Sequence, residues 1–324
     1  MLDQYGRTID YMRISITDRC NLRCRYCMPE GVTSPESHDD ILRYEEILRI
    51  CRAAVTLGIT KYKITGGEPL VRKGCADLIA ELKALPGVRQ VTLTTNGLLL
   101  RQKLDALCAA GLDAVNISLD TLDAEKFRAI TGWPDFSAEE LRALLANCCT
   151  RGLRTKLNTV LLEENRDEAA ELAALAEEFP VDVRFIELMP IGFGGSMTRV
   201  SPDEVLETLR VRWPDLHTTE EKRGNGPAHY FASAQLQGRI GFIDAVSHAF
   251  CAGCNRVRLT STGQLKPCLS YDSTTDLRAL LRAGCGDEEL RAALEQAICR
   301  KPRAHSFEHR EEMTERRTMS QIGG

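Results

Sequence analysis

Three cysteines lie close together near the N-terminus, at Cys20, Cys24 and Cys27. Thiolates suit soft metal centres such as iron–sulfur clusters, zinc or copper(I), and these three are too close in sequence to pair usefully as disulfides. Three thiolates can hold three irons of a four-iron cluster and leave the fourth iron open for a substrate or cofactor. A structural zinc site needs a fourth ligand, which no residue of this segment clearly supplies. The spacing therefore favours an iron–sulfur cluster over zinc.

A second cysteine group lies near the C-terminus, where Cys251 and Cys254 are followed by Cys268 after a predicted β-hairpin over 257–266. This spacing fits an incomplete zinc site or a second three-ligand cluster equally well. Arg256 and Arg258 stand two residues apart on a predicted strand, so both lie on one face beside the metal. They could be solvated surface residues, but paired guanidiniums suit phosphate recognition, which a structural zinc loop does not need. The arginines therefore favour a second cluster beside an anion site.

The elements that must position these groups alternate between strands and helices from residue 9 to about residue 190. Short β-rich runs predict strands at 9–16, 61–65, 90–95, 113–118, 154–160 and 182–187. Amphipathic patterns predict helices at 43–57, 74–85, 101–110, 123–130 with 137–151, and 166–178. Six successive βα units imply a parallel sheet, either open or curled into a barrel.

One face of nearly every predicted strand is polar, although a parallel sheet covered on both faces should be apolar on both. An edge-exposed sheet would have to repeat this pattern over six strands, so we expect the polar faces to converge on a lumen. The fold class is then α/β, a partial (βα)6 TIM-like barrel. The cations expected to face the lumen are Arg13, Lys61, Lys63, Lys156 and Arg184, with Arg256 and Arg258 from the hairpin. Buried unpaired positive charge is costly, so these cations predict a polyanionic ligand such as a triphosphate.

Special turn residues follow the predicted strands, at the end of a βα barrel where chemistry is found. They include Gly66-Gly67-Glu68-Pro69 after the second strand, in which the second glycine allows close approach to a cofactor. No G-x-x-x-x-G-K-[ST] loop occurs, which argues against P-loop phosphoryl transfer. The region 191–240 changes character and contains a predicted linker at 222–227. We therefore divide the chain into a partial-barrel domain at 1–225 and a second-cluster and substrate-binding region at 226–324.

The composition of the 324 residues is typical of a soluble globular protein, and the net charge of −4 predicts no general nucleic-acid-binding surface. The N-terminus lacks the features of a signal peptide, and no apolar run approaches transmembrane length. Thirteen cysteines without an export signal indicate a reducing, cytoplasmic setting with no membrane partner. The seven cysteines outside the two groups are expected to be small buried hydrophobes in helices.

The residues resemble the radical S-adenosylmethionine (SAM) enzymes and, more closely, the GTP 3′,8-cyclases of molybdenum cofactor biosynthesis, the family of molybdenum cofactor biosynthesis protein A. The first cysteine motif, with Tyr26 before its last cysteine, identifies only the superfamily. Segment 250–259 with its two arginines, joined to the terminal Gly323-Gly324, is more specific. Two departures bear on substrate affinity: Lys63 stands where the family usually has arginine, and Asp244-Ala245 replaces a small residue followed by proline.

The resemblance implies two 4Fe–4S clusters, SAM and GTP. By position, Cys20, Cys24 and Cys27 would hold the SAM-binding cluster, and Cys251, Cys254 and Cys268 the second cluster, which contacts the guanine. SAM would be held by Tyr26, Gly67, Thr94, Ser118 and Met189. The triphosphate and ribose would be held by Arg13, Lys61, Lys63, Lys156, Arg184, Arg256 and Arg258. The catalytic set would comprise Arg256, Arg258, Gly323 and Gly324, because the tail of this family reaches the active site.

The resemblance also implies the reaction. An electron from the first cluster would cleave SAM into methionine and a 5′-deoxyadenosyl radical, which would remove the ribose 3′ hydrogen of GTP, and the carbon radical would attack guanine C8. Reduction and protonation of the resulting radical would yield the product, (8S)-3′,8-cyclo-7,8-dihydroguanosine 5′-triphosphate, which would pass to cyclic pyranopterin monophosphate synthase. The partners implied are GTP and an external electron donor, with a homodimer as an open possibility.

Three other functions compete with this interpretation. A peptide-modifying radical SAM enzyme with an auxiliary cluster would need a peptide groove or leader-binding region, which the sequence does not suggest. A non-catalytic iron–sulfur electron carrier would need fully ligated clusters, whereas each group here stops at three cysteines. A zinc-dependent nucleic-acid module would need a basic surface, and the net charge of −4 has the opposite sign.

Overall fold

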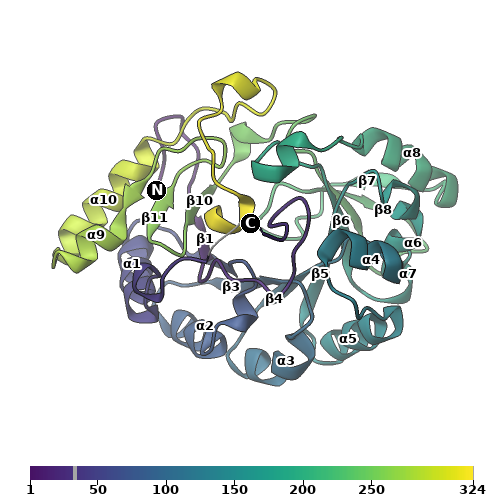
Figure 1. Ribbon diagram of the computed structural model, residues 1–324, viewed down its shortest axis with the longest axis horizontal. Helices are drawn as coiled ribbons and strands as arrows, with labels where there is room; N and C mark the ends of the chain where they lie inside the picture. Colours follow the sequence, from purple (N-terminus) through teal and green to yellow (C-terminus); the bar gives the residue numbers. More distant parts are fainter. Residues whose placement is uncertain (32–34, 324) are drawn as a thin grey trace.

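The computed structural model describes residues 1–31 and 35–323, and its centre is a curved parallel sheet ringed by helices (Figure 1). The six predicted strands are confirmed, and each pairs in parallel with the next. Their bounds are β1 (Tyr11–Ser15), β2 (Lys61–Thr65), β3 (Gln90–Thr95), β4 (Ala114–Ser118), β5 (Arg154–Val160) and β6 (Asp182–Ile186). The barrel is partial, as the polar strand faces predicted.

The C-terminal part of the chain extends both edges of this sheet. At one edge β10 (Arg256–Leu259) pairs in parallel with β1, and β11 (Gln264–Lys266) and β12 (Thr275–Asp276) continue antiparallel, so the predicted hairpin is confirmed. At the other edge β9 (Ile240–Ile243) pairs in parallel with β6, and β8 (His229–Ala232) and β7 (His217–Thr219) continue antiparallel. The result is one 12-stranded sheet in the described part of the chain. Residue 225 lies between β7 and β8, and the two-region division stays a prediction.

The helices of the barrel cover the outer face of the sheet. They are α1 (Tyr44–Thr56), α2 (Cys75–Ala84), α3 (Leu100–Ala109), α4 (Ala124–Thr131), α5 (Ala138–Thr150), α6 (Ala169–Ala173) and α7 (Leu175–Glu178). The helical pattern predicted at 166–178 is confirmed in extent, but it is divided: a 3₁₀ turn at 166–168 precedes α6, and Ala174 separates α6 from α7. The Ala176 carbonyl accepts from the backbone N–H of Gln237 at 2.8 Å, because the residue four positions further on is Pro180, which has no N–H to donate.

The remaining helices belong to the C-terminal half and to connecting loops. They are α8 (Pro202–Arg212), α9 (Leu277–Arg282), α10 (Asp287–Cys299) and α11 (Met319–Ile322), with short 3₁₀ turns at 38–40, 69–71, 192–196, 251–253 and 310–312. Helix α8 begins at Pro202, and the side chain of Ser201 before it makes no capping hydrogen bond. The chain ends beside the mouth of the barrel, where the C-terminus lies near the centre of Figure 1.

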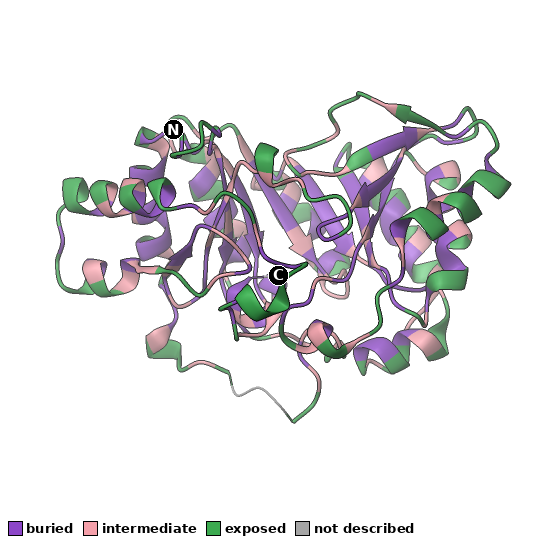
Figure 2. Ribbon diagram, turned by 90° about the horizontal axis from the view of Figure 1, so that it is seen from above, coloured by how far each residue is buried: buried purple, intermediate pink, exposed green. Residues whose placement is uncertain are grey.

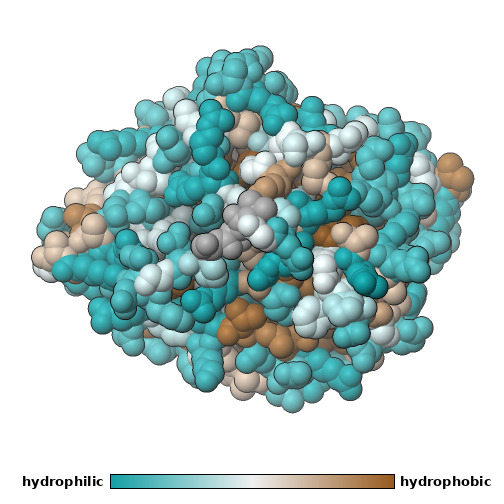
Figure 3. Space-filling view, in the orientation of Figure 1, coloured by the Kyte–Doolittle hydropathy of each residue, from teal (hydrophilic) through white to brown (hydrophobic). Residues whose placement is uncertain are grey.

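The outward faces of the strands form the core with the helices. Met12, Ile14, Tyr62 and Ile64 are fully buried on this face, and Figure 2 shows the strands as the most buried layer. The face of the molecule seen in Figure 3 is mostly hydrophilic. None of the helices in the described residues has the length and apolar character needed to cross a membrane.

The cysteines outside the two groups mostly pack in this core. Cys51, Cys75, Cys148 and Cys285 are buried, and Cys108 and Cys149 are partly buried against the core. The expectation is wrong for Cys299, which is exposed because it ends α10 at the surface, and Cys285 lies between two helices rather than within one.

Candidate active site

The first cysteine group lies in the loop that follows β1. Cys20, Cys24 and Cys27 line one cavity of about 250 Å³ at the C-terminal end of the strands. Burial, followed by the neighbouring Cys20 sulfur, raises the pKa of the Cys27 thiol to about 12. Burial and both neighbouring thiols also raise the pKa of Cys24. The three sulfurs are therefore close enough to repel one another as thiolates.

These thiols fit the donor set of a cluster with one open iron. Among the residues described, no group of three or more His, Cys, Asp or Glu side chains is placed to hold a single metal ion. A four-iron cluster is wider than an ion, and each thiolate binds its own iron. Three thiols on the wall of one cavity supply that arrangement and leave room beside them.

The residues predicted to hold the cofactor share this cavity with the cysteines. The structure brings Tyr26, Gly67, Thr94, Ser118 and Met189 together on its wall, from the ends of different strands. Glu68, Asn96 and Asp120 line it too and were not among the predicted site residues. The signal for them was present in the sequence, because each lies in a turn that follows a strand.

Gly66 and Gly67 pack against the loop after β1 that carries Cys20, Cys24 and Cys27, called the cluster loop below. The Gly67 N–H donates to the Thr17 carbonyl at 2.7 Å, and the Glu68 N–H donates to the Arg19 carbonyl at 2.8 Å. A Cβ on Gly67 would lie 2.3 Å from the Arg19 carbonyl oxygen. The glycine is therefore needed for contact with the loop that carries Cys20, in addition to any approach to a cofactor.

Glu68 is buried and holds the neighbouring strand exit. Its carboxylate accepts from the Thr95 hydroxyl at 2.7 Å, the Asn96 N–H at 2.7 Å and the Leu70 N–H at 3.0 Å. Burial raises the pKa of Glu68, and these hydrogen bonds oppose the rise. Asn96 in turn donates to the Asn21 side chain at 2.8 Å, within the cluster loop. The second and third strand exits thus support the cysteine loop.

Asp120 positions Tyr26 in the same loop. The Tyr26 hydroxyl donates to Asp120 Oδ2 at 2.7 Å, and the Val160 N–H donates to Oδ1 at 2.8 Å. Burial raises the pKa of Asp120 to about 6, while the bonds from Tyr26 and Val160 lower it. The cluster loop is therefore fixed from β4 and β5 as well.

The predicted cations gather inside the barrel, with one partial exception. In the strand register Arg13 lies between Lys63 and Arg258. Of the predicted cations, Arg13, Lys63, Lys156, Arg184 and Arg256 line a lumen cavity of about 90 Å³, and Arg258 lines the cysteine cavity. Lys61 lies at the rim, where it pairs with Asp10 at 2.7 Å and faces a separate open cavity of about 810 Å³.

Like charges crowd one another in the lumen. Burial, then Arg184 and Arg13, holds the pKa of Lys63 well below its ordinary value. Burial, then Arg13 and Arg256, does the same for the pKa of Arg258. With its oxygen turned inward, Asn116 accepts from Arg184 Nη2 at 3.0 Å and from Lys63. A lumen in this state favours an anionic ligand, which would relieve the repulsion.

Lys156 is held by residues that the sequence did not single out. Its Nζ lies 3.0 Å from Asp182 and donates to the Tyr230 hydroxyl at 2.8 Å and to the Arg223 carbonyl. The Arg223 guanidinium pairs with Asp182 at 2.7 Å. The predicted linker 222–227 therefore packs over the lumen, and its position depends on tertiary contacts that the sequence did not reveal.

The second cysteine group lies at the opposite end of the strands. Cys254 immediately precedes β10, and Cys268 follows β11, which runs antiparallel with Lys266 opposite Arg258. Both cysteines therefore lie at the N-terminal end of β10, whereas Cys20 follows the C-terminal end of β1. Burial raises the pKa of Cys254, but Arg256 and Lys301 outweigh it and lower the pKa to about 7.

Buried polar residues hold the segment that leads from the C-terminal end of β9 to the second group, and one of them, Glu187, also lines the first cysteine cavity. Glu187, at the end of β6, accepts from the Val246 N–H at 2.8 Å, the Ser247 N–H at 2.9 Å and the Ser247 hydroxyl at 2.6 Å. Arg7 donates to the Cys251 carbonyl at 2.9 Å. The departure Asp244 is buried, lies 3.5 Å from His229 and 3.3 Å from His248, and does not line the lumen cavity.

The C-terminal tail enters the site. The Gly323 carbonyl accepts from Arg258 Nη1 at 2.7 Å. Gly323 has φ 78°, and a Cβ there would lie 2.9 Å from the Ser15 Cβ, so glycine suits both the backbone and the space. Gly324, also predicted to act in the site, lies outside the described residues.

Comparison with known proteins gives consistent results along the chain. Residues 14–176 match the Radical SAM superfamily, and residues 181–307 match Molybdenum Cofactor Synthesis C. The chain is 43% identical over 325 residues to the GTP 3′,8-cyclase of Clostridium perfringens (strain 13 / Type A), covering 100% of both chains. It is 44% identical over 328 residues to that of Moorella thermoacetica, again covering 100% of both.

A solved structure shows the same fold at low identity. SuiB of Streptococcus suis bound to S-adenosylmethionine superposes with a TM-score of 0.64, covering 97% of this chain and 78% of that chain, at 15% sequence identity. That likeness concerns the fold alone.

Proposed function

The chain belongs to the radical SAM GTP 3′,8-cyclases, and we propose how its two cysteine groups and the cations between them carry out the cyclase reaction. The family is a group of lyases that catalyse the first step of molybdenum cofactor biosynthesis from GTP. The observation that carries the proposal is one cationic lumen with three thiols at each end. The full-length cyclase relatives favour this reaction over peptide modification.

A 4Fe–4S cluster and SAM are the cofactors that the superfamily implies. We assign Cys20, Cys24 and Cys27 to that cluster. SAM is assigned to the five residues on the same cavity wall, Tyr26, Gly67, Thr94, Ser118 and Met189. When bound, the cluster and SAM supply the 5′-deoxyadenosyl radical that removes a hydrogen atom from the substrate ribose.

We assign Cys251, Cys254 and Cys268 to a second 4Fe–4S cluster, in which these three thiolates would bind three of the four irons. The low pKa of Cys254 favours the thiolate that a cluster needs. Guanine at this end would place the ribose between the two cysteine groups, which lie at opposite ends of the strands. GTP bound in this single position could then undergo both the removal of the ribose hydrogen and the closure of the new ring.

The lumen cations hold the triphosphate and ribose in this scheme. We assign this role to Arg13, Lys61, Lys63, Lys156, Arg184, Arg256 and Arg258. Arg256 and Arg258, with Gly323 and Gly324, also act at the reacting centre, where Arg258 already contacts the tail. Lys63 supplies a point charge where a guanidinium would give a bidentate contact. Positive charge from several strands fixes the substrate without a phosphate-binding loop.

The wider setting of the enzyme follows the same assignment. We propose the cytoplasm as its location, an external electron donor as its reductant, and cyclic pyranopterin monophosphate synthase as the recipient of its product. No nucleic acid or membrane partner is proposed, and the homodimer that the sequence left open stays a prediction. The partial barrel at 1–225 would supply the radical, and residues 226–324 the second cluster and the tail.

Anaerobic reconstitution tests the proposal directly. We expect about eight irons per chain and about four in Cys254→Ala, because each triad would hold a four-iron cluster. Incubation with SAM, GTP and a strong reductant should give 5′-deoxyadenosine in a GTP-dependent way, together with a cyclised nucleotide. SAM cleavage that GTP does not alter would exclude GTP as the substrate. Zinc in place of iron would exclude the whole assignment.

A further inference from the structure

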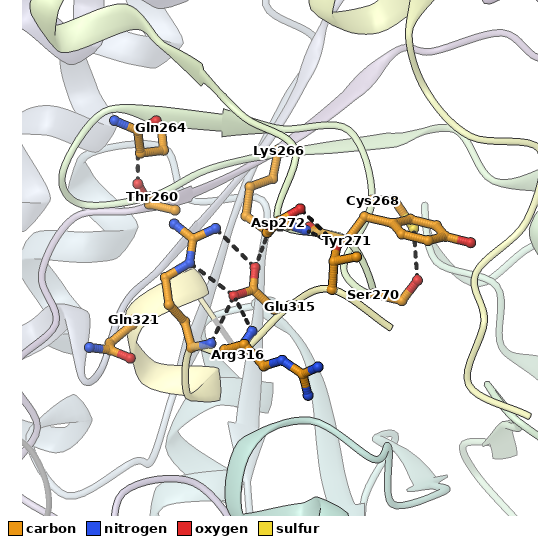
Figure 4. A network of polar contacts seen from close by, with 12 residues as sticks. Thr260, Gln264, Lys266, Cys268, Ser270, Tyr271, Asp272, Glu315, Arg316 and Gln321 are labelled. Carbon is orange, nitrogen blue, oxygen red and sulfur yellow. Dashed lines mark hydrogen bonds and ion pairs between the residues drawn. The ribbon is translucent and has the colours of Figure 1, made fainter. Parts of the chain in front are cut away.

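A buried ion pair joins the C-terminal tail to the strand that leads into Cys268. Lys266 is the last residue of β11, and its side chain is fully buried. Glu315 lies in the tail, and its side chain is only 1% exposed. The two side chains form an ion pair, and Lys266 also donates to the Tyr271 carbonyl at 2.6 Å. Figure 4 shows Glu315 at the centre of this network, with Lys266 and Cys268 on one side and Arg316 and Gln321 on the other.

Both oxygens of Glu315 are fully used. Oε1 accepts from the backbone N–H groups of Arg316 at 3.0 Å and Arg317 at 2.8 Å, and from Arg317 Nε at 3.0 Å. Oε2 accepts from Arg317 Nη2 at 2.9 Å and from Lys266. The carboxylate therefore fixes the direction of the chain at the point where the tail turns toward the barrel.

The tail contacts Cys27 and Arg258, which both line the first cysteine cavity, within eight residues of Glu315. The Ser320 N–H donates to the Cys27 sulfur, and the Gly323 carbonyl accepts from Arg258. Helix α11 has only four residues, so its position depends on what holds the segment before it. On the other side, the Glu315 N–H donates to the Ser270 carbonyl at 3.3 Å, two residues beyond Cys268.

From these contacts we infer that Glu315, clamped by Lys266 and Arg317, is a positioning residue that holds the Gly-Gly tail against Arg258. The inference rests on the proposed function, since it assigns the clamp to the same site. The clamp acts through the tail and touches neither the lumen cavity nor the first cysteine cavity. Its loss should therefore release the tail without emptying the cluster sites.

The test compares Glu315→Gln with Glu312→Gln, an exposed glutamate in the same segment, in the anaerobically reconstituted enzyme. Hydrogen exchange measures protection of residues 319–323, and steady-state assays measure kcat and KM for GTP. We expect exchange to rise at least about tenfold in Glu315→Gln only. We also expect kcat to fall at least about tenfold while KM changes less than about threefold and iron is unchanged.

A second variant keeps the inference testable if Glu315→Gln fails to fold. Arg317→Gln removes the more exposed of the two partners of Glu315 and leaves the buried ion pair with Lys266 in place. It should therefore raise hydrogen exchange and lower kcat in the same direction as Glu315→Gln, but by less. Unchanged protection of the tail in both variants would overturn the inference, even if activity fell. If the wild-type enzyme showed no GTP-dependent product but Glu315→Gln still released the tail, the clamp would stand and the proposed reaction would fail.

Discussion

Gly67→Ala is the sharpest test of how the second strand exit supports the cluster loop. The new Cβ would lie 2.3 Å from the Arg19 carbonyl oxygen, 2.6 Å from its carbon and 2.8 Å from the Asp18 carbonyl oxygen. An unstrained carbon–oxygen contact is about 3.3 Å. The atoms that must yield are backbone on both sides, so the cluster loop would have to move by about 1 Å.

A displacement of that size has a predictable cost. Overpacking costs about 1–3 kcal/mol in stability. Misplacement of reacting groups by about 1 Å can lower a rate about 100-fold, which corresponds to about 2.7 kcal/mol in the barrier. We therefore expect Gly67→Ala to form 5′-deoxyadenosine about 100-fold more slowly than wild type, because Cys20 follows Arg19 directly.

The assay is anaerobic SAM cleavage with a strong reductant, with iron determined on the same samples. Gly286→Ala is the control, since a Cβ at Gly286 meets nothing within 4 Å. We expect the control to match wild type and the irons of the second cluster to remain in Gly67→Ala. A Gly67→Ala enzyme with full iron and a rate within about threefold of wild type would refute the steric reasoning.

Three further predictions concern charge. Lys63→Met removes a buried cation that lies among like charges, so it should raise the free energy of unfolding of the ligand-free protein, measured in urea, by about 1–3 kcal/mol. The same variant should raise KM for GTP at least about tenfold. A lower free energy of unfolding would contradict this prediction. Glu187→Gln should leave a hydrogen-bond donor of the 246–247 loop unsatisfied and so lower the free energy of unfolding by about 1–3 kcal/mol. The iron content should fall from about eight toward about four irons per chain, whereas the control Glu125→Gln, at an exposed residue, should keep all its iron. Burial raises the pKa of Glu315, but Arg317 and Lys266 lower it to about 2. The ionised Glu315 therefore contributes about 3 kcal/mol to the free energy of unfolding above about pH 4.5, and this contribution is lost as the pH falls toward about 2. The difference in free energy of unfolding between wild type and Glu315→Gln should therefore shrink by about 1 kcal/mol between about pH 7 and pH 4. A difference that stays constant over this range would count against the ion pair.

Much of the fold could be predicted because its signals are local. Hydrophobic periodicity located the six strands and most helices, and the polar strand faces indicated a lumen, since side chains alternate between faces. The helical pattern at 166–178 shows the limit of such signals. Its extent was predicted, but the interruption at Ala174 that divides it into α6 and α7 was not.

The sequence by itself determined the chemistry of the site. Cysteine spacing, the paired arginines and the glycine tail each lie in short segments, so their meaning did not depend on the fold. Tertiary structure decided where that chemistry acts. It placed the cysteine groups at opposite ends of the strands, moved Lys61 to the rim beside Asp10 and buried Glu315 against Lys266. Such pairings join residues far apart in sequence, and they arise because a buried charge must find a partner that only the folded chain supplies.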